Sequence, residues 1–174
     1  MQNHVRTSLD TDAPRVAELL IASRKAFLPF APSVHSEEEI HHWVGNTLIP
    51  GGHVTVALAE SVIVGALAVS MQDEVTWVDQ LYIQPGHVGQ GIGATLLALV
   101  VAAASGPIRL HTFQQHKRAR RFYERQGFVA IEFTDGSGNE EKCPDVRYEL
   151  RASQNAAYYS FERTCLRQAS HVKR

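Results

Sequence analysis

Three glycines at alternate positions, Gly89, Gly91 and Gly93, lie in the segment Val88–Leu97 and lead directly into an apolar run. Glycine allows a positive φ and a close approach of a ligand to the main chain. The N-terminus of a helix offers unpaired N–H groups and a partial positive charge. A glycine turn that opens a helix therefore predicts a binding site for a phosphate or pyrophosphate group.

Two common nucleotide motifs match this segment poorly. Gly89, Gly91 and Ala94 satisfy the loose pattern G-x-G-x-x-G/A of dinucleotide-binding turns. That fold also needs an acidic residue at the end of the next strand, and the predicted strand Ile108–Phe113 contains none. The chain has no Gly-Lys-Ser/Thr sequence, which excludes a P-loop. A nicotinamide-dependent enzyme is therefore a distant alternative.

The elements around the glycine turn alternate between strand and helix patterns, which indicates a mixed α/β sheet. Apolar periodicity and turn residues predict helices over Thr11–Phe27, Ser36–Leu48, Ile92–Ala104 and His116–Gln126. They predict strands over Val5–Thr7, His53–Glu60, Val62–Met71, Thr76–Ile83, Ile108–Phe113, Phe128–Thr134 and Val146–Leu150. Ser36 followed by Glu39 predicts a capping box at the start of the second helix.

Two blocks of the chain resemble the GNAT superfamily of acetyl-CoA-dependent N-acetyltransferases. In Leu81–Leu97 the strand LYIQP precedes the turn VGQGIG and an apolar helix, and His116–Phe128 contains ARRFYERQGF. The resemblance covers about Val5 to Leu150. It implies an α/β fold of α+β type, with one mixed, mostly antiparallel sheet of about six or seven strands and about four helices. Residues 1–150 would form this domain, and residues 151–174 a tail or short helix.

The resemblance implies that coenzyme A is the phosphate-bearing ligand, with acetyl-CoA as co-substrate. In the family, the strand before the turn contacts the pantetheine arm, which here implies Leu81 and Ile83. The glycine turn holds the pyrophosphate, and the implied cradle consists of Val88, Gly89, Gln90, Gly91, Gly93 and Ala94. Val88 departs from the family, which usually has Gln or Arg there. Main-chain N–H groups make most cradle contacts, so we expect binding to survive.

His116, Ala119 and Tyr123 are spaced three and four residues apart and share one face of a helix. The resemblance implies that small Ala119 lets the cofactor approach, and that His116 contacts it where the family usually has Asn. Tyr123 matches the usual general acid, because a phenol with a pKa of about 10 can protonate the departing thiolate at neutral pH. The alternatives are a solvated helix start for His116 and a core position for Tyr123.

A base is needed because an alkyl amine is almost fully protonated at pH 7. The family often has Glu near the position of Trp77, and this chain lacks it. Asp79 lies two residues further on, hence on the same face of a regular strand. We predict Asp79 as the base, acting directly or through water, with a structural or orienting carboxylate as the alternative. Gln80 is expected to point to the opposite face.

The residues that would bind the acceptor amine are the least well defined by the sequence. The segment between the first two helices usually covers the acceptor site in this fold, so Phe30 and His35 are predicted to contact it. Asn139 and Glu140 of the turn-rich segment Asp135–Asp145 are further candidates. Together with Glu141 and Asp145 they could attract a cationic amine, although a solvated hairpin loop explains them equally well. Trp43 is expected in the core. A small amine and a protein amine both stay open as acceptors.

Composition narrows the partners and the compartment. A formal net charge of −1 at pH 7 implies no bulk attraction to nucleic acid or to a membrane. The N-terminus lacks a signal peptide, and there is no apolar run of about 18 residues. Cys143 and Cys165 are far apart and suggest a reducing compartment. We therefore expect a cytoplasmic protein.

The histidines do not form a ligand set, so we expect no metal site. His41 and His42 are adjacent and point to different faces of a helix, and His111 and His116 lack a Cys or carboxylate at ligand spacing. The resemblance further suggests a homodimer. The leading hypothesis is an N-acetyltransferase in which the amine attacks acetyl-CoA directly in a ternary complex. The alternative is a non-catalytic acyl-CoA-binding or sensing module of the same fold.

Overall fold

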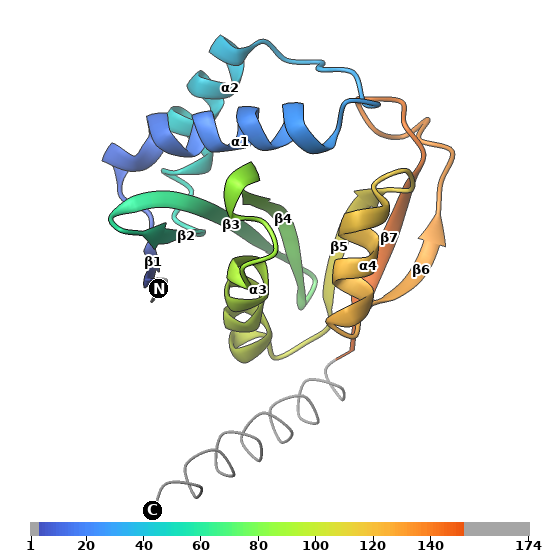
Figure 1. Cartoon of the computed structure of the whole chain (residues 1–174). Helices are drawn as coiled ribbons and strands as arrows, with labels where there is room; N and C mark the ends of the chain where they lie inside the picture. Colours follow the sequence, from blue (N-terminus) through green and yellow to red (C-terminus); the bar gives the residue numbers. More distant parts are fainter. Residues whose placement is uncertain (1–3, 152–174) are drawn as a thin grey trace, which may run out of the picture.

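A seven-stranded sheet in the order β1-β2-β3-β4-β5-β7-β6 runs through the centre of the computed structural model, which describes residues 4–151 (Figure 1). Neighbouring strands are antiparallel except for the central pair β4 and β5, which are parallel. The predicted mixed, mostly antiparallel sheet with about four helices is therefore confirmed. The predicted tail lies, apart from its first residue, outside the described residues.

The elements lie close to the ranges that the sequence predicts, with one exception in the second helix. The strands are β1 (His4–Thr7), β2 (Val54–Ala59), β3 (Val62–Gln72), β4 (Val75–Ile83), β5 (Ile108–Phe113), β6 (Val129–Phe133) and β7 (Asp145–Leu150). The helices are α1 (Ala13–Phe27), α2 (Glu37–Trp43), α3 (Ile92–Ala103) and α4 (Lys117–Arg125), with short turns η1 (Asp10–Asp12), η2 (Val44–Leu48) and η3 (Pro85–His87).

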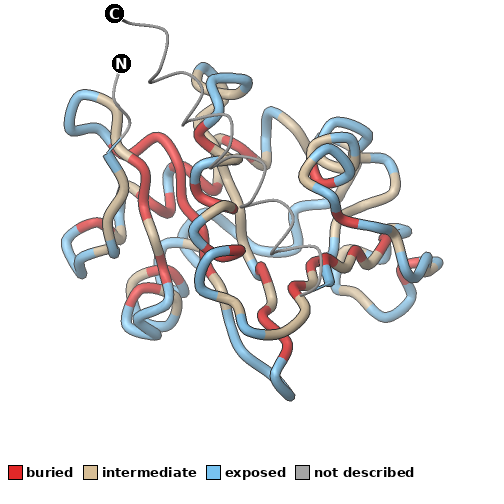
Figure 2. The backbone as a smooth tube through the Cα atoms, turned by 90° about the horizontal axis from the view of Figure 1, so that it is seen from below, coloured by how far each residue is buried: buried red, intermediate tan, exposed pale blue. Residues whose placement is uncertain are grey.

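The sheet separates two apolar clusters, one under each helical layer. On one face, α1 and α2 cover a cluster that includes Leu19, Val44 and Val56. On the other face, α3 and α4 cover a cluster that includes Leu96 and Tyr148. The tube in Figure 2 shows buried segments in the strands and in the inner sides of the helices. Both layers are needed to hold β4 in place, because its side chains contribute to both clusters.

The second helix begins as predicted but does not continue as one regular helix. Ser36 Oγ accepts from the Glu39 N–H at 3.2 Å, and the Glu39 carboxylate accepts from the Ser36 N–H at 2.7 Å, which completes the capping box. The α-helix then changes at Val44 into the π-turn η2, in which the Ile49 N–H donates to the Val44 carbonyl at 3.0 Å. The predicted helix Ser36–Leu48 is therefore two pieces.

Gly65 of β3 lets α3 lie close against the sheet. A Cβ atom at this position would come within 3.0 Å of Ile92, 3.1 Å of Ile83 and 3.2 Å of Leu96. Any larger residue would push α3 outward, because Cβ contacts of this length are too tight for a packed core. This close packing fixes the N-terminus of α3 beside the end of β4, where the glycine turn lies.

Candidate active site

A cavity opens where the two parallel central strands move apart. β4 and β5 pair only from Thr76 with Ile108 to Val78 with Leu110, and beyond that point each strand pairs only with its other neighbour. Figure 1 shows the two strands diverging between α3 and α4. The cavity between them has a volume of about 560 Å³. Unpaired strand groups, a helix N-terminus and the face of α4 therefore meet around one space.

The glycine turn at the end of β4 has the backbone that an anion-binding site needs. Gly89 and Gly91 have φ of 90° and 81°, which side-chain-bearing residues rarely adopt. Gly91 caps α3, and the first bond inside the helix runs from the Thr95 N–H to the Gly91 carbonyl at 3.0 Å. The preceding N–H groups of the first turn thus have no acceptor in the helix, and the first turn carries no acidic residue. The turn fits a phosphate group.

Nine of the ten residues predicted to bind the cofactor line this cavity. They are Leu81, Ile83, Val88, Gly89, Gly91, Gly93, Ala94, His116 and Ala119. Gln90 is exposed and is not among the lining residues; its Nε2 donates to the Gly86 carbonyl at 3.2 Å. If Gln90 binds the cofactor as predicted, its main-chain N–H is the group that makes the contact. His116 precedes α4, and burial together with the Arg118 charge lowers its pKa, which favours the neutral ring.

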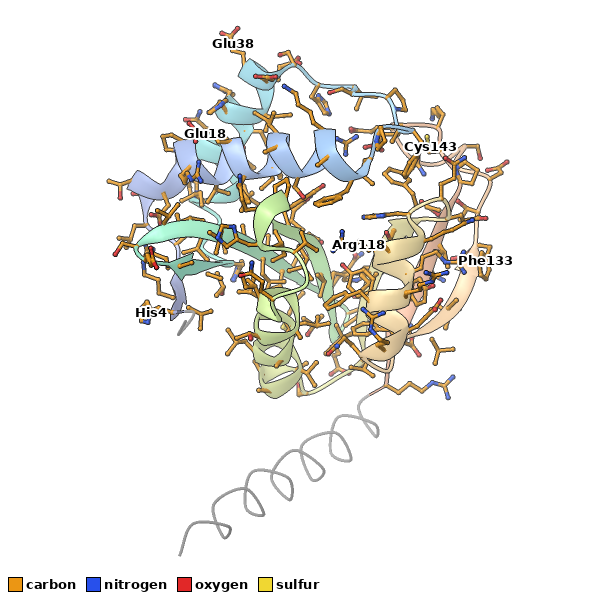
Figure 3. All side chains as sticks on the ribbon, in the orientation of Figure 1. His4, Glu18, Glu38, Arg118, Phe133 and Cys143 are labelled. Carbon is orange, nitrogen blue, oxygen red and sulfur yellow. The ribbon has the colours of Figure 1, made fainter. Side chains whose placement is uncertain are left out.

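Two basic or polar residues of the cavity wall were not predicted. His87 lines the cavity, and its buried Nδ1 has no hydrogen-bond partner in the described part of the chain. Arg118 of α4 also lines it, with its guanidinium 5.5 Å from the Phe27 ring centroid, and Figure 3 shows its side chain in the space between α3 and α4. Arg118 adds positive charge to the cavity wall, and His87 adds a ring nitrogen directly beside the glycine turn.

Tyr123 lies on the cavity side of α4 within an aromatic cluster. It is 8% exposed and lines the cavity, and its ring centroid is 5.1 Å from that of Phe122 and 5.8 Å from that of Phe128. Burial, with a smaller contribution from Tyr82, raises the pKa of the Tyr123 hydroxyl above its usual value. The phenol is therefore protonated at neutral pH and has a proton to give, although the raised pKa makes it a weaker acid than a free phenol.

Asp79 lies at a β-bulge, so the alternation of a regular strand does not decide which face its side chain occupies. In the register between β3 and β4, Val69 pairs with Val78 and Ala68 pairs with Gln80, so Asp79 is the extra residue. Its carboxylate accepts from Ser70 Oγ at 3.1 Å, and Ser70 pairs with Trp77, so Asp79 does lie on the Trp77 face. Desolvation raises the pKa of Asp79, and the Ser70 hydrogen bond opposes that shift.

The prediction that Gln80 points away from this face is wrong. Gln80 pairs with Ala68, which packs in the cluster under α1 and α2. Two residues of β4 oppose one residue of β3 at the bulge, so the strict alternation of a regular strand fails there. Gln80 therefore shares the Trp77 face, and it lines the cavity together with Asp79.

A second cavity, of about 570 Å³, lies on the α1–α2 side of β4. Its wall comes from α1, the segment before α2, α2 itself, β4 and the β6–β7 loop, and it consists of Leu20, Arg24, Ser33, Val34, His35, Glu39, Ile40, Trp43, Gln80, Tyr82, Glu140 and Glu141. Gln80, Tyr82 and Glu141 line both cavities. These three residues are the wall that the two spaces share.

The four residues predicted to contact the acceptor lie in different surroundings. His35 and Glu140 line the second cavity and contact each other, with Nε2 and Oε2 2.9 Å apart. Asn139 lines the first cavity, but its side chain is engaged with the Cys143 main chain and with Asp145. Phe30 is among the lining residues of neither cavity and packs edge-on against Phe113, with centroids 5.9 Å apart.

Trp43 is not a core residue, which corrects the expectation from the sequence. It is 37% exposed and lines the second cavity. The α-helix ends at Trp43 and continues as the π-turn. The 3.6-residue periodicity that predicts a buried position for Trp43 therefore does not continue past this residue. An indole at the wall of an open cavity is available to a ligand.

Arg24 and Glu141 form an ion pair at the shared wall, 117 residues apart in sequence. Arg24 Nη2 is 2.9 Å from Glu141 Oε1, and the two side chains are 23% and 17% exposed. Tyr82 contacts this pair: its hydroxyl is buried, which raises its pKa, while the Arg24 charge and hydrogen bond oppose the rise. The pair joins α1 to the β6–β7 loop, and no local sequence signal could have found it.

The part of the chain that the structure describes lacks the features of a metal site and of a membrane span. Within residues 4–151, no group of three or more His, Cys, Asp or Glu side chains is arranged to hold a metal ion. None of the helices in that range has the length and apolar character needed to cross a membrane.

The family of the chain follows from its sequence match. A model of the acetyltransferase (GNAT) family matches residues 17–128, which span β4, the glycine turn and α4. The chain belongs to the GNAT family. The resemblance carried by the glycine turn and by the Tyr123 block is thereby confirmed. None of the curated proteins compared with the chain gives a significant match.

Solved structures of GNAT proteins share the fold. PaiA N-acetyltransferase of Thermoplasma acidophilum, in complex with coenzyme A, is 22% identical with a TM-score of 0.70, over 87% of this chain and 99% of that chain. YjaB of Escherichia coli is 21% identical with a TM-score of 0.68, over 86% and 97%. The ribosomal-protein-S18-alanine N-acetyltransferase of Escherichia coli is 13% identical with a TM-score of 0.66, over 87% and 94%.

Proposed function

We propose that this GNAT protein transfers an acetyl group from acetyl-CoA to a primary amine by direct attack, with both substrates bound together. The observation that carries the proposal is the pair of cavities that share Gln80, Tyr82 and Glu141 as a common wall. One cavity has a glycine turn suited to a pyrophosphate, and the other holds side chains suited to an acceptor. A thioester in the first and an amine in the second would meet at this wall.

The first cavity fits coenzyme A through main-chain groups. Gly89 and Gly91 take the positive φ that turns N–H groups toward an anion, and a Cβ at either position would meet nothing within 4 Å, so the space beside them is open. At Leu81 and Ile83, β4 pairs with β3 but no longer with β5. The edge of β4 that faces β5 is therefore available there to the amide groups of the pantetheine arm. Bound acetyl-CoA supplies the activated acyl group. The complex of PaiA with coenzyme A supports this assignment.

Tyr123 is proposed to hold the proton that the departing sulfur needs. In the transfer, the nitrogen–carbon bond of the amide forms and the carbon–sulfur bond of the thioester breaks, and the sulfur leaves with a negative charge. Because its pKa is raised by burial, the Tyr123 hydroxyl is protonated at this moment and lies in the wall of the cavity. A positioned general acid of this kind contributes about 10²–10⁴ in rate.

Asp79 is proposed to take a proton from the amine, directly or through a water. Its carboxylate lines the first cavity beside the shared wall, and Ser70 holds it by a hydrogen bond of 3.1 Å. Its raised pKa makes it a stronger base than a free carboxylate. The ammonium group loses one proton before it attacks, and Asp79 passes that proton to solvent. The second proton, which leaves the nitrogen as the amide forms, balances the proton that Tyr123 gives to the sulfur, and solvent restores Tyr123.

Direct attack is favoured over an acyl-enzyme by the position of Cys143. Its Sγ contacts the Glu141 carbonyl oxygen at 3.4 Å within the β6–β7 loop, and it is not among the residues that line either cavity. Cys165 lies outside the described residues. Location in the cytoplasm and a homodimeric state stay predictions.

The test is an assay of free thiol release from acetyl-CoA with a panel of amines, run beside a direct measurement of acetyl-CoA binding. The proposal predicts thiol release that depends on one class of amine. Tight acetyl-CoA binding without release on any amine would overturn it and favour the acyl-CoA-sensing alternative.

A further inference from the structure

The second cavity has the dimensions of a site for one small molecule. Its volume of about 570 Å³ falls within the range of roughly 300–1,000 Å³ in which small ligands bind. The Arg24–Glu141 ion pair and the hydrogen bond between His35 and Glu140 join the α1–α2 segment to the β6–β7 loop. Figure 1 shows these two segments meeting above β5 and β7. The volume therefore suits a small molecule rather than an extended protein chain.

One side of the cavity is apolar and contains an accessible indole. Leu20 and Ile40 line it together with Trp43, whose 37% exposure is high for a tryptophan at a helix end. An aromatic face binds an apolar body and also attracts a cation. The occupant therefore has an apolar or aromatic part.

The charged part of the cavity favours a cation. Glu39, Glu140 and Glu141 face a single guanidinium, that of Arg24, so the lining is net negative whether His35 is neutral or charged. Arg24 is already engaged, because it donates to Glu141 at 2.9 Å and to the Pro32 carbonyl at 3.3 Å. The guanidinium is shared between these two acceptors, whereas the hydrogen bond from Arg24 engages Glu141 through Oε1. A cationic group therefore fits this lining better than a carboxylate does.

We propose that the second cavity binds a small primary amine with an apolar or aromatic body and no carboxylate, with its ammonium group beside Glu141. Glu141 is the lining carboxylate of this cavity that also lines the first, so an amine held there stands at the shared wall. The inference rests on the proposed function, because a bound amine is an acceptor only if this protein transfers an acetyl group. It excludes free amino acids and protein N-termini as preferred acceptors.

The experiment compares three probes of similar body on the full chain saturated with coenzyme A: 2-phenylethylamine, phenylalanine and a dipeptide that begins with phenylalanine. Binding is measured by calorimetry, and acetyl transfer by thiol release from acetyl-CoA. The variant is Glu141→Gln. Its matched control is Glu38→Gln, because Glu38 is exposed on α2, lines neither cavity and projects outward in Figure 3.

We expect 2-phenylethylamine to bind at least roughly tenfold tighter than phenylalanine or the dipeptide, the scale of one charge-assisted contact. Glu141→Gln should weaken its binding by a similar factor, whereas Glu38→Gln should leave it unchanged. If the amine binds with this pattern but no thiol is released, the inference stands and the proposed function fails. The inference is overturned if phenylalanine or the dipeptide is preferred, if 2-phenylethylamine does not bind, or if the two variants behave alike.

Discussion

The two cavities on either side of β4 are built from different parts of the chain. At the glycine turn, the first consists of main-chain groups and small residues, and the rest of its wall comes from α1, β4, β5, α4 and the β6–β7 loop. The second is made of long side chains that come from α1, α2 and the β6–β7 loop. Main-chain groups are present whatever the side chain, whereas a side-chain wall changes with every substitution.

This difference explains why one side of the site is general and the other specific. We expect Val88 to be tolerated in place of the usual polar residue of the family, because the turn still offers its N–H groups. No comparable tolerance exists at the Arg24–Glu141 pair, where loss of one partner leaves the other charge without its counterpart. We expect substitutions at chemistry-bearing side chains to have the largest effects and those in the cradle the smallest.

The largest effect is expected for Tyr123→Phe, which removes the proton donor and leaves the ring in place. The value of kcat should fall by about 10²–10⁴, with acetyl-CoA affinity nearly unchanged. Steady-state thiol release and calorimetry check the two quantities. Tyr148→Phe is the matched control: its buried hydroxyl contacts Glu124 and Arg120 outside both cavities. Equal kcat in wild type and Tyr123→Phe would assign Tyr123 to the core alone.

The next largest effect is expected for Asp79→Asn, which should lower kcat/KM about 10²-fold at neutral pH if Asp79 is the base. In the wild type, activity should fall as pH drops through the raised pKa of Asp79, because a protonated carboxyl cannot accept a proton. Ser70→Ala removes the hydrogen bond that lowers this pKa, so the acidic limb should move to higher pH. A pH profile of kcat/KM that is identical in Ser70→Ala and wild type would count against Asp79.

A moderate effect is expected for Gly91→Val in the cradle. A branched side chain at φ of 81° costs about 1–2 kcal/mol, which should distort the start of α3 and weaken coenzyme A binding about tenfold. Gly138→Val is the control, because Gly138 lacks a positive φ and a Cβ there meets nothing within 4 Å. Calorimetric affinities that are equal in the two variants would show that the turn does not hold the ligand.

The smallest effect is expected for Val88→Arg, which restores a polar side chain of the kind common in the family. A solvent-exposed charge contact is worth about 0.2–1 kcal/mol, so coenzyme A should bind only about two- to fivefold tighter, and the gain should shrink at high salt. A gain of several hundredfold would contradict the view that main-chain groups dominate the cradle.

The contrast between the cavities also separates what could be predicted from the sequence and what could not. Gly89 and Gly91 signal their own backbone geometry, and the spacing of His116, Ala119 and Tyr123 defines a helix face, so these positions could be placed without a structure. Gln80 could not, because the bulge at Asp79 leaves no mark in an alternating strand pattern. The mostly antiparallel pairing of the strands followed from the family resemblance rather than from propensity.

The acceptor side was harder for a physical reason. Its lining is brought together by contacts between segments far apart in the chain, such as Arg24 with Glu141 and His35 with Glu140. Local patterns carry no information on such pairs. The turn-rich loop was recognised as a candidate region, but the sequence could not distinguish Asn139, which stabilises the loop, from Glu141, which lies at the shared wall.

The central claim is that both substrates occupy the two cavities at once and react across the shared wall. Initial velocities measured while acetyl-CoA and an accepted amine are both varied test this most directly. The account predicts double-reciprocal lines that intersect, as for a ternary complex. Parallel lines, the pattern of an acyl-enzyme that forms before the amine binds, would contradict it.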